Sequence, residues 1–196
     1  DMLSLSGHKL HGPKGIGALY VKRGVELTPL IHGGGQEGKM RAGTENVAGI
    51  AGFGAACELA NKALNAKESD RVRGLRDKLE KGVKEAVPEA KLNGHPELRL
   101  PNTLNISFPG VAGSAILEHA TDIAASTGSA CHAEDKVPSG VLGTMGLPVE
   151  RARGTVRLSV GLSTSEEDII QAATSLIAAY QNLSGRSPPM AGKPTG

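Results

Sequence analysis

The chain has 196 residues, of which 39% are apolar and 21% are charged, and its formal net charge is +2. This composition excludes a disordered polyelectrolyte, and so small a charge gives no electrostatic reason to expect a nucleic-acid partner. The sequence has no run of about 18 apolar residues, so we expect neither a membrane span nor a membrane partner. Two cysteines are too few for a disulfide framework, which favours a reducing, intracellular compartment.

The first third of the chain is predicted to hold two short strands and a helix. Alternating polar and apolar residues predict a strand over 1–6, and an apolar run bounded by glycine predicts another over 18–21. A glycine-rich loop follows, and its end, Thr44–Asn46, is expected to cap a helix over about 46–64. Small residues suit this helix to close packing, and we expect Cys57 on it to be an inert core residue.

The rest of the chain is predicted to alternate helices with strands. A helix is defined by apolar residues at spacings of three and four, and Pro88 ends it: Val72, Leu75, Leu79 and Val83. Further strands are predicted over 103–108, 123–126 and 155–160, and helices over 114–120, 141–147 and 166–181. The last helix is expected to turn six side chains inward: Ile169, Ile170, Ala173, Leu176, Ile177 and Tyr180.

Strands that alternate with helices predict an α/β or α+β layered fold. From about 88 to 183 the elements suffice for a small independent sheet with helices on one side, whereas 1–45 resemble the edge of another sheet. Because the chain opens on Asp1 and not on methionine, we expect it to be part of a longer polypeptide. After Leu183 proline, glycine and serine dominate, and a tail that does not fold is expected.

Lys9 is the first candidate for chemistry, because it follows a strand and stands beside Ser6 and His8. An imine-forming lysine needs a lowered pKa, which burial or nearby positive charge supplies. Ser6 and His8 are suited to donate hydrogen bonds to an anion such as phosphate. The alternative interpretation is a solvated loop lysine with a histidine packed against the sheet.

Cys131 is the second candidate, in a loop of small residues that leaves its thiol accessible as a nucleophile. The neighbouring His132 is suited to lower the pKa of that thiol. The alternative is an inert, half-buried thiol. Neither cysteine has a partner at metal-ligand spacing, so no metal site is expected.

Arg157 is the third candidate, since it stands inside an apolar strand where its guanidinium needs an anionic partner. A bidentate contact with a carboxylate is the natural hypothesis, and an edge-strand arginine that reaches water is the alternative. Backbone amides of Gly33–Gly35 and the hydroxyl of Thr44 near a helix start would suit a phosphate. A mobile glycine loop is the alternative there.

Several motifs occur together in one order along the chain. They are Ser6-Gly7-His8-Lys9, Gly12-Pro13-Lys14-Gly15-Ile16-Gly17, Gly33-Gly34-Gly35-Gln36-Glu37, Arg41-Ala42-Gly43-Thr44-Glu45-Asn46, Leu100-Pro101-Asn102-Thr103, Gly128-Ser129-Ala130-Cys131, Pro138-Ser139 and Arg157-Leu158-Ser159-Val160-Gly161. In this order they resemble the class V aminotransferase group, and within it the cysteine desulfurases and their relative selenocysteine lyase. The resemblance covers residues 1 to about 183.

The resemblance implies the type I fold of enzymes that depend on pyridoxal 5'-phosphate. Residues 1–66 would be the remnant of the large cofactor domain with its linking helix, and 67–183 the complete small α+β domain with the catalytic-cysteine loop. Residues 184–196 would be a disordered tail. Departing from the family, Leu162 stands where an arginine usually follows the arginine strand.

The resemblance also assigns the cofactor residues. Lys9 would hold pyridoxal phosphate as an imine and move the substrate's α-proton, while Ser6 and His8 would bind the cofactor phosphate. Thr44 would reach the phosphate in the other subunit of a homodimer. The family's N-terminal half supplies the remaining cofactor contacts, none of which is found here, so we expect this chain alone to bind the cofactor weakly, if at all, and to be inactive.

The substrate residues follow from the same resemblance. Cys131 would take sulfur from L-cysteine as a persulfide and leave L-alanine, and Arg157 would hold the substrate α-carboxylate. The sulfur would pass to an acceptor protein, as in iron–sulfur cluster assembly, in the cytoplasm or, in a eukaryote, the mitochondrion. Three alternatives stay open: a selenocysteine lyase acting on L-selenocysteine, an aminotransferase without sulfur chemistry, and a non-catalytic interaction module.

Overall fold

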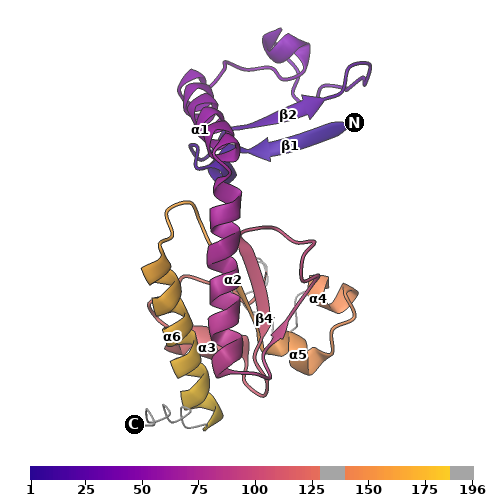
Figure 1. Ribbon diagram of the computed structural model, residues 1–196. Coiled ribbons are helices and arrows are strands. Elements are labelled where there is room, and N and C mark those ends of the chain that lie inside the picture. The colour runs from indigo at the N-terminus through magenta and orange to yellow at the C-terminus, as the bar shows by residue number, and fades with distance from the viewer. Residues whose placement is uncertain (129–139, 186–196) are drawn as a thin grey trace. The chain divides into compact units, whose positions relative to one another are not determined.

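The computed structural model describes residues 1–128 and 140–185, which form helices and small sheets (Figure 1). The chain divides into two compact units, Asp1–Lys67 and Glu68–Gly196, and each is described by itself. The predicted α/β class is confirmed, since strands and helices alternate along the described residues. None of the helices within these residues is long and apolar enough to cross a membrane.

The first unit is built on a β-hairpin whose strands lie where the sequence predicts them. β1 (Met2–Ser6) pairs antiparallel with β2 (Gly17–Val21), so that Ser6 is opposite Gly17. A Cβ at Gly17 would collide with the carbonyl oxygen of Leu5, and only glycine fits there. The 3₁₀ helix η1 (Gly7–Leu10) follows β1 directly, and a second one, η2 (Gln36–Lys39), lies in the glycine-rich loop.

Helix α1 (Val47–Asn65) begins as predicted, with the Asn46 side chain accepting a hydrogen bond of 3.1 Å from the backbone N–H of Gly49. Its contacts with the η1 loop run along one stripe: Gly52 lies against Pro13, and Ala56 is buried near Gly12. The prediction that Cys57 is a core residue is wrong, because Cys57 is exposed. At 3.6 residues per turn, the residue after Ala56 is rotated away from the packed stripe.

The second unit holds a three-stranded antiparallel sheet in the order β3-β4-β5. Its strands are β3 (Lys91–Leu92), β4 (Thr103–Ser107) and β5 (Thr155–Ser159). In β4 the residues Leu104 and Ile106 are buried, and in β5 Val156 and Leu158 are buried, so one face of the sheet belongs to the core. β4 and β5 were predicted. β3 was not, because two residues are too few to show a period.

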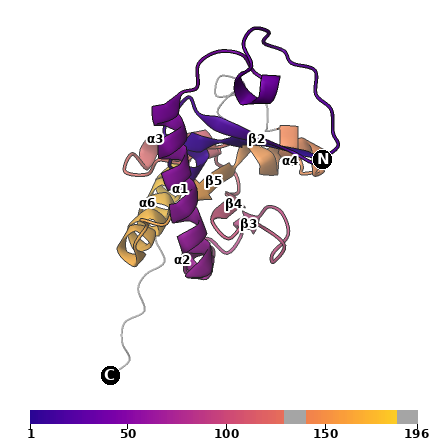
Figure 2. The same ribbon diagram turned by 90° about the horizontal axis from the view of Figure 1, so that it is seen from above.

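Helices cover the apolar face of this sheet. α2 (Glu68–Ala86) and α6 (Glu166–Ser184) run side by side, and α3 (Gly113–His119) packs on α6 (Figures 1 and 2). The short helices α4 (Gly140–Thr144) and α5 (Val149–Arg153) precede β5. The predicted helical spacing of α2 is confirmed, since its four apolar residues are all buried: Val72, Leu75, Leu79 and Val83.

Helix α6 starts on a capping box in which Ser165 and Asp168 exchange hydrogen bonds, and it ends at Gly185 in the left-handed region. Leu176 and Tyr180 are buried as predicted, and the Tyr180 ring lies 5.4 Å from that of Phe108 between centroids. Ile170 is 66% exposed, so its predicted inward position is wrong. It lies one residue past the buried Ile169 and is turned about 100° away from the core.

The predicted strand over 123–126 is reduced to one β-bridge between Ser126 and Arg157. Ser184, the first residue of the predicted tail, belongs to α6, and 186–196 lie outside the described residues.

Candidate functional site

Lys9 lies on η1, the 3₁₀ turn that leaves the end of β1. Ser6 is the last residue of β1 and has an extended backbone, with φ −106° and ψ 123°, where the turn begins. Ser6, His8 and Lys9 are exposed, and no hydrogen bond or ion pair engages their side chains among the described residues. The strand-to-turn junction therefore presents a hydroxyl, an imidazole and a primary amine within four residues.

The close packing of Gly7 fixes this junction. Its N–H donates to the carbonyl oxygen of Ile16 at 2.8 Å, and its own carbonyl accepts from the N–H of Gly12 at 2.9 Å. A Cβ on Gly7 would lie 2.8 Å from Cγ2 of Ile16 and 2.9 Å from its carbonyl oxygen. Because those distances are too short for a carbon atom, only glycine lets the turn close against residue 16. The turn in this way holds His8 and Lys9 at the end of β1.

The glycine-rich loop is folded by the side chain of Gln36. Its Oε1 accepts from the N–H of Gly43 at 3.2 Å, and Arg41 Nη1 donates to the Gly43 carbonyl at 2.7 Å. Thr44 follows directly and is exposed. Among the described residues no hydrogen bond joins Thr44 to the residues around Lys9, and its predicted phosphate contact lies in the other subunit of a homodimer.

Arg157 occupies the centre of β5 and is half-buried. Its N–H donates to the carbonyl oxygen of Ser126 at 2.6 Å, and its carbonyl accepts from the Ser126 N–H at 3.2 Å. On the other side it stands directly opposite Asn105 of β4. Since Val156 and Leu158 face the core, alternation places the Arg157 side chain on the opposite, polar face of the sheet. No ion pair or hydrogen bond from its guanidinium reaches another described residue.

Beside Arg157 the polar face carries a hydrogen-bond network that was not predicted from the sequence. Asn93 Nδ2 donates to Asn105 Oδ1 at 2.8 Å and to Ser107 Oγ at 2.7 Å, and Ser107 Oγ lies 2.9 Å from Thr155 Oγ1. Arg151 Nε donates to Asn93 Oδ1 at 2.9 Å. The available signal was the polar alternation of Thr103, Asn105 and Ser107 along β4.

Cys131 and His132 lie outside the described residues, as does the Pro138-Ser139 motif. The chain enters that segment through a turn at Ser126, whose hydroxyl donates to the carbonyl of Gly128 at 2.6 Å and accepts from the Gly128 N–H at 3.1 Å. Ser126 thus links the start of the predicted cysteine loop to the backbone of Arg157.

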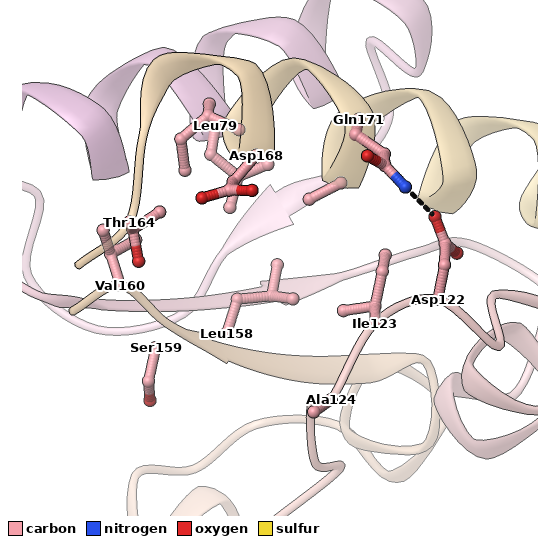
Figure 3. A pocket seen from close by; sticks show the side chains of 12 residues that line it. Leu79, Asp122, Ile123, Ala124, Leu158, Ser159, Val160, Thr164, Asp168 and Gln171 are labelled. Atoms are coloured by element: carbon pink, nitrogen blue, oxygen red, sulfur yellow. Dashed lines mark hydrogen bonds between the residues drawn. The ribbon is translucent and has the colours of Figure 1, made fainter.

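A separate cavity of about 270 Å³ lies between β5 and α6 (Figure 3). Asp122 stands at its rim and accepts hydrogen bonds from Ser175 Oγ at 2.6 Å and Gln171 Nε2 at 3.1 Å, which lower the pKa of its carboxyl. Its inner wall is apolar, with Leu79 and Leu158 among the lining residues, and none of the predicted site residues lines it. Across 1–128 and 140–185 no group of three or more His, Cys, Asp or Glu residues is placed to hold a metal ion.

The two units therefore divide the candidate residues between a lysine-bearing turn and an arginine-bearing strand. A family profile described as aminotransferase class-V matches residues 1–171, and the chain belongs to this family. The predicted resemblance is confirmed at that level.

Comparison with individual proteins shows which members of this family the chain resembles. A cysteine desulfurase of Gluconacetobacter diazotrophicus is 53% identical over 171 residues, which cover 86% of this chain and 42% of the relative. A cysteine desulfurase IscS of Clostridium botulinum is 49% identical over 173 residues, covering 86% and 43%. A solved NifS-like protein superposes with a TM-score of 0.82 at 35% identity, covering 93% of this chain and 47% of its own. The chain thus spans less than half the length of these relatives.

Proposed function

We propose that this chain carries the lysine, arginine and cysteine of a pyridoxal-phosphate-dependent cysteine desulfurase. The observation that supports the proposal most is the Lys9 turn, where a free primary amine stands next to an imidazole and near a hydroxyl at a strand end locked by Gly7. Several relatives of about half sequence identity bear the name cysteine desulfurase. The donor set of the turn suits a ligand that has both an aldehyde and a phosphate, so the residues present fit this cofactor.

In this proposal each residue of the turn has a distinct part. The Lys9 amine would hold the cofactor covalently and, once released from it, would move a proton at the substrate α-carbon. The Ser6 hydroxyl and His8 imidazole donate hydrogen bonds to the phosphate, and Thr44 contacts the phosphate in the second subunit of a homodimer. When bound, the cofactor supplies an electron sink for charge that develops at the α-carbon.

Arg157 and Cys131 act on the substrate. The Arg157 guanidinium, without an ionic partner among the described residues, holds the α-carboxylate of L-cysteine. The Cys131 thiolate attacks the substrate sulfur, so that an S–S bond forms while the substrate C–S bond breaks. The products are a persulfide on Cys131 and, after protonation at carbon, L-alanine. An acceptor protein then takes the sulfur, for uses such as iron–sulfur cluster assembly.

A chimera tests the activity directly. In it this chain replaces the matching 42% of the Gluconacetobacter diazotrophicus relative, and alanine and sulfide release from L-cysteine are measured. The proposal predicts activity that is lost in Lys9→Ala and Cys131→Ser and retained in Cys57→Ser, since Cys57 is an exposed thiol on α1. A well-folded chimera that is inactive, or one unaffected by Cys131→Ser, would contradict it. L-selenocysteine as a second substrate decides the selenium alternative.

A further inference from the structure

The polar face of the β4–β5 pair places an amide beside the arginine. Asn105 and Arg157 are directly opposite each other in the register, and neither belongs to the core face. Directly opposed residues of an antiparallel pair have their Cβ atoms about 4.5–5.5 Å apart. The backbone N–H and C=O of Arg157 both bond to Ser126, so they form no hydrogen bond with β4. Arg157 and Asn105 are therefore a non-hydrogen-bonded pair, which is the more closely spaced of the two pair types in an antiparallel sheet.

The orientation of the Asn105 amide follows from a chain of hydrogen bonds that starts at Arg151. A guanidinium has donors only, so the Asn93 atom that it contacts at 2.9 Å is the acceptor Oδ1. The amide nitrogen of Asn93 is then the atom that faces Asn105, 2.8 Å away, and it requires an acceptor there. Asn105 therefore directs its oxygen to Asn93 and turns its own N–H₂ group away from it.

Arg151 is held firmly in this position. Its Nη2 donates to the carbonyl oxygen of Leu92 at 2.7 Å, and its own carbonyl accepts from Thr155 Oγ1 at 3.2 Å. Asn93 is 6% exposed, so the contact that sets the amide orientation is shielded from water. The Asn105 N–H₂ group, in contrast, has no hydrogen-bond partner among the described residues and is not enclosed.

We propose that the Arg157 guanidinium and the Asn105 side-chain N–H₂ form one two-donor site for a carboxylate, and that Arg151 and Asn93 set the polarity of that site. The proposal rests on the carboxylate-binding part proposed for Arg157 and adds a second contacting residue with two positioning residues behind it. The outward residues of β4 and β5 include no acid, so neither strand places a negative charge next to the two donors. An amide rotated the other way would present its oxygen and weaken the site.

The site is testable in the 196-residue chain without cofactor or turnover. Isotope-labelled protein is titrated with L-alanine, and the NMR signals of the Asn105 side-chain N–H₂ and the Arg157 Nε–H are followed. Both are expected to shift with one common midpoint, and L-alaninamide, which lacks the carboxylate, is expected to shift neither. Asn105→Asp replaces the donor with a negative oxygen and is expected to weaken binding at least about tenfold.

Asn102→Asp is the matched control. It makes the same chemical change just before β4, at a residue that is not among the outward-facing residues of this strand. It is expected to leave the midpoint nearly unchanged. Asn105→Ala removes the donors without adding charge, and it is expected to weaken binding less than Asn105→Asp does. An intact spectrum of each variant shows that it is folded.

The outcomes separate the two proposals. Shifts at Arg157 without shifts at Asn105, or equal binding by Asn105→Asp, contradict the two-donor site and leave the proposed function standing. Shared shifts together with an inactive chimera uphold the site and contradict the desulfurase function. Absence of shifts at both residues contradicts the site and the part proposed for Arg157.

Discussion

The two units of the chain differ in how far they bury their own apolar side chains. In Asp1–Lys67 only Gly7, Gly49 and Ala56 are buried among the residues described. The second unit encloses a core that reaches full burial at several positions: Val83, Leu104, Ile106, Ile116, Val156 and Leu176. The unit that carries Lys9 is therefore shaped by backbone packing, and the unit that carries Arg157 is shaped by a hydrophobic core.

The hairpin of the first unit shows this difference most clearly. Leu3 and Tyr20 face one side of the β1–β2 ribbon and are 57% and 59% exposed. Leu19, on the other side, is 55% exposed. A two-stranded ribbon with bare apolar faces is marginal in water by itself. The lysine turn accordingly depends on glycines that let the chain close on itself.

The largest expected effect is a difference in unfolding free energy between one leucine-to-alanine substitution in the second unit and one in the first. Leu176→Ala removes a side chain with 0% exposure from the core of the second unit and is expected to lower the free energy of unfolding by about 2–5 kcal/mol. Leu59→Ala, at a position 65% exposed on α1, is expected to change it by less than about 0.5 kcal/mol. Denaturant unfolding followed by circular dichroism measures both. Equal losses of unfolding free energy in the two variants would contradict the proposed difference in core burial between the units.

A smaller effect is expected from a methyl group added at the lysine turn. Gly7→Ala places a carbon 2.8–2.9 Å from Ile16 and is expected to cost about 1–3 kcal/mol locally. Hydrogen exchange at the N–H groups of residues 7 and 12, which hold the turn, is expected to accelerate. Gly54→Ala is the control, because a Cβ there meets nothing within 4 Å. Protection of both amides retained in Gly7→Ala would show that the turn does not depend on this contact.

The smallest expected effect is a pH dependence confined to the second unit. Burial raises the pKa of the Glu80 carboxyl, but hydrogen bonds from Lys84 and Arg99 outweigh it and leave the pKa below its usual value. A carboxyl with a lowered folded-state pKa stabilises the fold above its unfolded-state pKa, and this stability is lost as pH falls through the folded-state pKa.

Glu80→Gln is therefore expected to lower the midpoint of thermal unfolding near neutral pH and to matter much less in acid. Glu85→Gln, in an exposed pair with Lys81, is the control and is expected to have little effect at either pH. A loss in Glu80→Gln that is independent of pH would contradict the account of this carboxyl.

The sequence was sufficient for elements whose side chains show a period, and insufficient where tertiary contacts decide. The spacing of Val72 to Val83 predicted α2, and the alternation over residues 1–6 predicted β1. Cys57 and Ile170 were misplaced because one residue of rotation separates a packed helix face from an exposed one.

The candidate site likewise combines residues that sequence motifs identify with residues that only tertiary contacts identify. Lys9 and Arg157 were found from motifs in the chain. Asn105 was not, because its significance comes from standing opposite Arg157 in the register. The hydrogen bond from Arg151 to Asn93 joins residues 58 positions apart, and no local sequence pattern predicts it.

The central claim is that the turn at the end of β1 directs cofactor chemistry to Lys9 and to no neighbouring lysine. The direct measurement is to incubate the 196-residue chain with excess pyridoxal phosphate, reduce with borohydride and map the modified lysines by mass spectrometry. Reduction makes the lysine–cofactor bond permanent, so even weak binding is recorded. The account predicts that Lys9 is modified well above Lys14, which lies in the loop between β1 and β2, and that Lys9→Arg leaves only low, uniform modification. Equal modification of Lys9 and Lys14 would contradict it.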